Sequence, residues 1–132
     1  MRLDEKLNMR LLDFAVNTIN LVQEFSKNAV GLHVKNQLLR AVTSPGANYE
    51  EACGAESRRD FCHKMGIVLK EIKETRYWLP LAQKIPFIKP ASRFDSSLEE
   101  VEQLIAIFAK SINTAREKIK PIIGQSSLII EH

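Results

Sequence analysis

Residues 96–122 read SSLEEVEQLIAIFAKSINTAREKIKPI, and the spacing of their apolar residues decides the fold. These residues recur in alternating steps of three and four: Leu98, Val101, Ile105, Phe108, Ile112, Ala115, Ile119 and Ile122. That spacing places them on one face of a helix and is typical of the seams of helical bundles. Because Pro121 and Gly124 are signals for a helix end, we expect a helix over about 96–120. Ser96 and Glu99 have the spacing of a capping box at its start.

Three further stripes with helical spacing precede this one. They predict helices over about 4–27, 32–54 and 57–84, separated by short connections. Ser57 is placed to cap the last of these, with Asp60 in its first turn. Four amphipathic helices with short connections give an all-α, antiparallel, up-down-up-down four-helix bundle. We therefore expect a single domain over residues 1–124 and a C-terminal tail over residues 125–132.

Pro45 lies within the stripe of the helix over 32–54 and does not disturb its phase. A proline inside a helix removes one N–H donor and crowds the carbonyl four residues earlier, here that of Ala41. We therefore expect a kink and not a helix end. The hydroxyls of Thr43 and Ser44 are placed to satisfy the freed carbonyls.

The composition narrows the possible functions. The chain has 132 residues, 45% of them hydrophobic and 27% charged, and its five glycines exclude a glycine-rich phosphate loop. Two cysteines, Cys53 and Cys62, are too few for a disulfide framework or a four-ligand zinc site, so we expect no metal and no cofactor. The charged N-terminus is not a signal peptide, and no apolar run approaches the ~20 residues of a membrane span. We expect a cytoplasmic protein without a membrane partner.

The helix over 57–84 carries a second edge beside its core stripe. Ile67 and Trp78 lie about 100° or more from the centre of that stripe. The full edge consists of Asp60, Lys64, Ile67, Glu71, Glu74 and Trp78. An apolar edge with interspersed charges and a tryptophan anchor is typical of a subunit interface. The alternative is a solvated face that happens to include a tryptophan.

Basic residues gather at the start of the same helix and at the end of the last one. The candidates for nucleic-acid contact are Arg58, Arg59, Lys64, Lys110, Arg116, Lys118 and Lys120. Phosphate binding needs such a row on one surface, whereas a solvated face is the ordinary alternative and the one favoured for a single protomer. The formal net charge is only +3 per chain, although a ring of five chains would carry about +15.

Catalytic patterns are weak in this sequence. Arg58 and His63 have the spacing of a ribonuclease signature in some other helical bundles, with histidine as the acid or base. Five residues along a helix separate two side chains by about 140°, which is less favourable than three or four residues. We expect that the protein is not an enzyme.

Three segments together resemble the four helix bundle protein family, the proteins encoded in intervening sequences of bacterial 23S rRNA genes. They are LLRAVTSPGANYEEA at 38–52, SRRDFCHKM at 57–65 and LKEIKETRYWL at 69–79. The family usually has isoleucine where this chain has Pro45, and Glu56 replaces a common glutamine or arginine. The residues that match the family pattern are Asn48, Glu50, Glu51, Ser57, Asp60, Lys64, Lys70, Glu71, Glu74, Thr75, Tyr77 and Trp78.

The resemblance implies an antiparallel four-helix protomer that assembles into a homopentamer. A distantly similar protein, the accessory variability protein of diversity-generating retroelements, is a basic pentamer that binds nucleic acid and a reverse transcriptase. We interpret Asn48 as a buried polar residue bonded to a neighbouring helix, and Glu51 as a partner for a base on the helix over 57–84 of this or another subunit.

The expected function is that of a non-enzymatic homopentamer, a scaffold associated with RNA, DNA or a ribonucleoprotein. The alternative is an oligomeric adaptor that binds a protein partner and no nucleic acid. A small ribonuclease is the third hypothesis.

Overall fold

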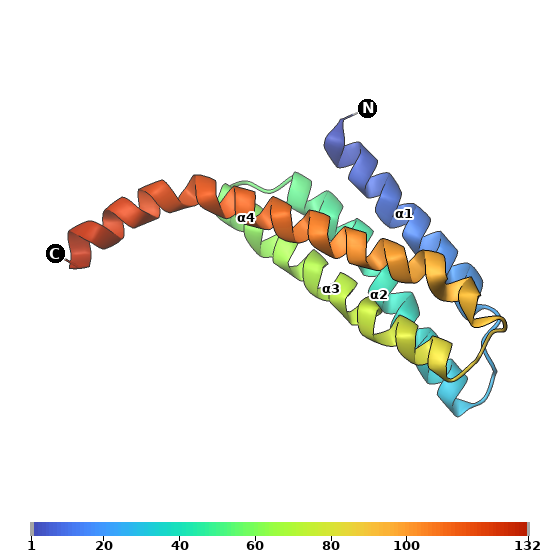
Figure 1. Cartoon of the computed structure of the whole chain (residues 1–132). Helices are drawn as coiled ribbons and strands as arrows, with labels where there is room; N and C mark the ends of the chain where they lie inside the picture. Colours follow the sequence, from blue (N-terminus) through green and yellow to red (C-terminus); the bar gives the residue numbers. More distant parts are fainter. Residues whose placement is uncertain (1, 132) are drawn as a thin grey trace.

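The chain folds into four long helices, as the computed structural model of residues 2–131 shows (Figure 1). Side chains are described for residue 2 and residues 4–119. The elements are α1 (Leu3–Val22), α2 (Ala29–Cys53), α3 (Arg58–Lys84), a short 3₁₀ helix η1 (Ala91–Phe94) and α4 (Asp95–Glu131). Residues 2–131 contain no strand, which confirms the predicted all-α class with four helices. The α1–α2 and α3–α4 connections lie at one end of the molecule and the α2–α3 turn lies at the other (Figure 1).

Side-chain caps fix the starts of two helices. The N–H of Asp60 donates to Oγ of Ser57 at 3.0 Å, which confirms the predicted cap of α3. The N–H of Gly31 donates to Oδ1 of Asn28 at 2.8 Å, so α2 begins at Ala29, earlier than predicted. The predicted capping box of Ser96 and Glu99 is wrong, because η1 leads directly into α4 at Asp95 and Ser96 lies inside that helix.

Two helix ends differ from the prediction. α1 ends at Val22, five residues early, and Phe25 packs from the following turn on Phe87, with ring centroids 4.7 Å apart. α4 continues to Glu131, past the end predicted near residue 120, so residues 125–131 of the predicted tail are helical. A proline costs a helix one hydrogen bond and a glycine costs about 1 kcal/mol, but neither prevents the chain from continuing. His132 lies outside the described residues.

All four helices contribute to one hydrophobic core. α2 packs against α1 and α3, and α3 packs against α4, whereas α1 and α4 meet less closely. The fully buried side chains include Leu11, Leu38, Met65, Ile72, Leu104 and Phe108. On α4 the core is centred on Leu104, which is fully buried, while Ile105 of the predicted stripe is half-buried.

Pro45 is buried inside α2, and the helix continues through it as predicted. The expectation for the hydroxyl of Thr43 is wrong, because Oγ1 donates to the carbonyl of Leu39 at 2.6 Å and not to that of Ala41. The hydroxyl of a threonine in a helix bonds most easily to the carbonyl four residues earlier. It therefore does not reach the carbonyl of Ala41, which lacks its usual donor because Pro45 has no N–H.

Two ion pairs link segments that are distant in the sequence. The guanidinium of Arg10 on α1 makes two bonds to Glu100 on α4, at 2.5 and 3.1 Å, and a third to Gln103 at 3.0 Å. Arg93 of η1 makes two bonds to Glu24 after α1, at 2.6 and 2.7 Å. Fork-shaped pairing of this kind restricts orientation as well as distance, so the Arg10–Glu100 pair favours one position of α1 beside α4.

Candidate nucleic-acid interface

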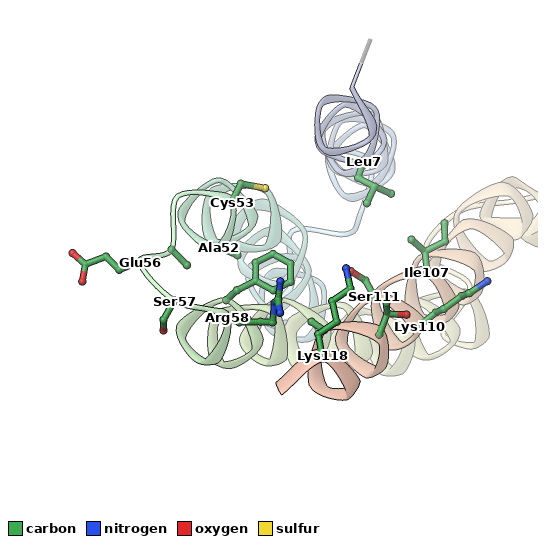
Figure 2. A pocket seen from close by; sticks show the side chains of 14 residues that line it. Leu7, Ala52, Cys53, Glu56, Ser57, Arg58, Ile107, Lys110, Ser111 and Lys118 are labelled. Carbon is green, nitrogen blue, oxygen red and sulfur yellow. The ribbon is translucent and has the colours of Figure 1, made fainter. Parts of the chain in front are cut away.

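A cavity of about 900 Å³ lies at the end of the molecule where α2 turns into α3. All four helices contribute to its lining (Figure 2). Its walls are largely apolar, formed by Leu7, Ala52, Phe61, Ile107 and Ala115. The cavity exists because α1 packs less closely against α4 than against α2, which leaves a gap beside the α2–α3 turn.

Three basic residues line this cavity. Arg58 is the first residue of α3, and Lys110 and Lys118 lie two turns apart on α4. The side chains of Arg58 and Lys118 point toward the centre of the cavity, whereas Lys110 points outward (Figure 2). Glu56 is the acidic residue of the lining, and its carboxylate points away from the other side chains (Figure 2). The interior therefore presents positive charge above apolar walls.

Three other basic candidates, Lys64, Arg59 and Arg116, do not join this group. Lys64 pairs with Asp60 at 3.4 Å. Arg59 and Arg116 are exposed and do not line the cavity, since Arg116 lies about 160° around α4 from Lys118. Lys120 belongs to the part of α4 whose side chains are not described. Of the six predicted residues whose side chains are described, the structure thus brings three together at the cavity.

The predicted interface edge of α3 is partly occupied within the protomer. Nδ2 of Asn48 on α2 donates to Oε1 of Glu71 at 2.8 Å, which links the two helices through a half-buried pair. Trp78 is half-buried and meets His33 of α2 edge-on, with ring centroids 5.7 Å apart. Ile67 is 39% exposed and Glu74 is half-buried. Fewer residues of this edge are therefore available to contact another subunit than the sequence suggests.

Glu51 is exposed on α2, near the α2–α3 turn.

A second apolar surface, missed by the sequence analysis, runs along α1. Met9, Leu12 and Val16 are 50%, 62% and 46% exposed and lie beside an apolar groove of about 640 Å³ between α1 and α2. We call these three residues the α1 stripe. Their spacing of three and four residues is the signal that reveals them, as a second helical face beside the core stripe of Leu7, Leu11 and Phe14.

The cysteine in the cavity wall is held in its thiol form. Burial is the largest cause that raises the pKa of Cys53, although its hydrogen bond with Tyr49 acts in the opposite direction. Burial also raises the pKa of Tyr49, with the contact to Cys53 as the next cause. Both groups are therefore protonated near neutral pH. Cys53 is accessible from the cavity, whereas Cys62 is buried on α3.

The arginine and the histidine that were considered for a ribonuclease do not share the cavity. His63 is exposed and does not line the cavity that contains Arg58. Within residues 4–119 there is no group of three or more His, Cys, Asp or Glu side chains that could hold a metal ion. The described helices also include none that is both long and apolar enough to cross a membrane.

Comparisons with known proteins place these features in context. Residues 6–118 match the protein family described as 23S rRNA-intervening sequence protein, which confirms the resemblance drawn from the sequence. The fold is similar to the crystal structure of a protein of unknown function from the S23 ribosomal protein family of Bacteroides thetaiotaomicron VPI-5482. That match has a TM-score of 0.74 and 33% sequence identity, and it covers 83% of this chain and 97% of the other. No curated protein matches the sequence.

Proposed function

The chain belongs to the 23S rRNA-intervening sequence protein family, and from this membership we propose that it is a non-enzymatic, cytoplasmic, homopentameric scaffold that associates with nucleic acid. Each protomer is an antiparallel bundle that runs up, down, up and down. The observation that supports nucleic-acid association is the cavity lined by Arg58, Lys110 and Lys118. Lysine and arginine side chains on one surface are the groups that bind nucleic-acid phosphates.

The basic residues of the cavity are not engaged by the described acids of the protomer. Several other basic residues are engaged by acids within the protomer: Arg10 by Glu100, Lys64 by Asp60, Arg76 by Glu102 and Arg93 by Glu24. Among the described side chains, no acid lies within 4.0 Å of the charged groups of Arg58, Lys110 or Lys118. These three side chains are therefore available to a phosphate, although basic residues outside the cavity, among them Arg59, Lys70 and Arg116, form no ion pair with the described side chains either.

Filter binding of a structured RNA at two salt concentrations tests this function. The double variant Arg58→Gln/Lys118→Gln removes two charges from the cavity, and Arg59→Gln/Arg116→Gln removes two exposed charges outside it. We expect the cavity variant to bind more weakly and to flatten the dependence of log affinity on log salt by about 0.7–0.9 for each phosphate that the protein no longer neutralises. The control variant keeps more of the affinity. Absence of RNA retention even at low salt would contradict nucleic-acid binding.

Homo-oligomer formation is supported by the exposed apolar side chains. The α1 stripe places three large aliphatic residues in solvent on one helix face, and Ile67 and Tyr77 are exposed on α3. Apolar residues that gather on one surface and are rimmed by polar groups mark a contact with another protein surface. A second copy of the chain is the occupant that family membership favours. A different protein is the alternative, which corresponds to an adaptor without nucleic acid.

Light scattering distinguishes the two surfaces. A pentamer has about five times the protomer mass of 15.0 kDa. We expect Leu12→Glu to lower the mass, because a charge placed in the α1 stripe cannot be buried without a partner. Ile67→Glu is the matched change on the α3 edge, and a loss of mass in this variant alone would place the interface there. A monomeric wild-type protein would overturn the pentamer and leave the adaptor as the better hypothesis.

A further inference from the structure

The cavity beside the α2–α3 turn has a shape and chemistry more specific than a phosphate-binding surface. Its volume of about 900 Å³ falls within the range of about 300–1,000 Å³ that small-molecule sites occupy. It combines apolar walls with two inward-pointing cations, Arg58 and Lys118 (Figure 2). A flat basic face suits the backbone of a duplex, whereas a concave site of this kind suits a ligand with an apolar body and an anionic group.

We propose that this cavity accepts a single unpaired nucleotide, with its base against Phe61 and its phosphate between Arg58 and Lys118. The inference rests on the proposed function, and it specifies single-stranded or looped nucleic acid as the preferred class. Phe61 is half-buried, lines the cavity and follows Arg58 by three residues on α3. Residues three apart share a helix face, so the ring and the guanidinium are presented to the same space.

Base stacking on an aromatic ring requires that the base be unpaired. Proteins that recognise single strands combine aromatic side chains, which stack on bases, with basic side chains, which follow the backbone. A paired base keeps both faces covered by its neighbours in the duplex, so it has no face left to stack on the ring of Phe61. The aromatic ring in the lining of this open site therefore favours single strands over duplexes.

Glu56 and Asp60 do not engage the two cations, whereas Asp4 and Glu50 lie near Cys53 in the cavity wall and add to burial in raising the pKa of that thiol. Glu56 points away from the interior (Figure 2), and Asp60 is paired with Lys64 at 3.4 Å. The N-terminal end of the 27-residue helix α3 adds partial positive charge at Arg58, which favours an anionic group at the same point. Ser111 and Thr114 on α4 also line the cavity and supply hydroxyl groups for polar edges of a base.

Cys53 provides a built-in reporter of occupancy, because its thiol lines the cavity while Cys62 is buried. The experiment compares a ten-nucleotide single-stranded RNA with a blunt duplex of the same length, using the full-length protein. For each probe we measure affinity and the rate at which a small thiol reagent modifies Cys53, at one fixed pH. We expect the single strand to bind roughly tenfold more tightly than the duplex and to slow modification of Cys53 severalfold.

Phe61→Leu removes the aromatic face but keeps an apolar side chain of similar size. We expect this variant to bind the single strand roughly tenfold more weakly, with duplex binding unchanged. Equal binding of the two probes, no protection of Cys53 and no effect of Phe61→Leu would overturn the nucleotide site while leaving nucleic-acid association intact. Absence of binding to either probe at low salt would overturn both proposals. Should Phe61→Leu fail to fold, protection of Cys53 in the wild-type protein decides the outcome.

Discussion

Gly31 lies in the first turn of α2, against the connection from α1. Its replacement by alanine tests how closely the backbone packs at this end of the molecule. Gly31 is buried in the first turn of α2, and its N–H is held by Oδ1 of Asn28 at 2.8 Å. A Cβ atom added at Gly31 would lie 1.9 Å from the carbonyl oxygen of Ser26 and 2.8 Å from its carbonyl carbon. Since both neighbours are backbone atoms, no side-chain rotation relieves the contact.

The magnitude follows from two opposing effects. Alanine is favoured over glycine in a helix by about 1 kcal/mol, and forcing an extra atom into a packed site costs about 3 kcal/mol. The free energy of unfolding of Gly31→Ala should therefore fall by about 2 kcal/mol, which lowers the melting temperature by roughly 8 °C for a domain of this size. Gly66→Ala is the matched control on α3, because an added Cβ there meets nothing within 4 Å. That variant should be more stable by about 1 kcal/mol.

Urea unfolding followed by far-ultraviolet circular dichroism measures both variants at one fixed protein concentration, so that any oligomer contributes equally. Gly46→Ala serves as a second control on α2, since its added Cβ would lie at an ordinary distance of 3.8 Å from Oδ1 of Asn8. Equal stability of Gly31→Ala and Gly66→Ala would refute the reasoning, because it would mean that the carbonyl of Ser26 does not occupy the space beside Gly31.

Two further expectations concern single side chains. Thr18 is fully buried on α1, and its Oγ1 has no hydrogen-bond partner among the described residues, so Thr18→Val should raise the free energy of unfolding by about 1 kcal/mol in urea. A less stable variant would reveal a partner for that hydroxyl. Burial raises the pKa of Cys53, so its rate of alkylation at neutral pH, followed by mass spectrometry, should be lower than that of free cysteine and should increase with pH. Cys62 should react only on unfolding, and a Cys53 that reacts as fast as free cysteine at neutral pH would contradict the assignment.

Hydrophobic periodicity was sufficient to predict the helices, because each stripe is a local property of the sequence. The stripe from Leu98 to Ala115 identifies α4, and the cap at Ser57 identifies the start of α3. Proline and glycine were poor predictors of where a helix ends, because a helix can continue through them. Pro121 and Gly124 indicate an end, yet α4 continues to Glu131, just as α2 continues through Pro45. A proline or a glycine destabilises one turn of a helix. Whether the helix ends there or continues depends on how the neighbouring elements pack against it.

The candidate site depends on contacts between distant segments and was therefore predicted only in part. Arg58 and Lys118 were both recognised as basic candidates, but 60 residues separate them, and only the packing of α3 against α4 brings them to one cavity. Lys64 has the same charge and lies closer to Arg58 in sequence, yet Asp60 engages it at 3.4 Å on another side of α3. Residue type therefore identified the basic residues that could bind phosphate. The packing of the helices against one another determines which of them lie at the cavity.

The small net charge has a different significance for one chain than for an assembly of chains. A charge of +3 spread evenly over one chain attracts nucleic acid weakly. Arg58 and Lys118 form no ion pair among the described side chains and meet at one open cavity, whereas other unpaired basic residues, such as Lys70 and Arg116, lie elsewhere. In the proposed pentamer this cavity occurs five times around a ring, so that a single strand held at one cavity meets the next at high effective concentration. Affinity then depends on assembly more than on the strength of any one cavity. The α1 stripe and the basic cavity lie on different surfaces. In the proposed pentamer both contribute to affinity for nucleic acid, the stripe through assembly and the cavity through contact.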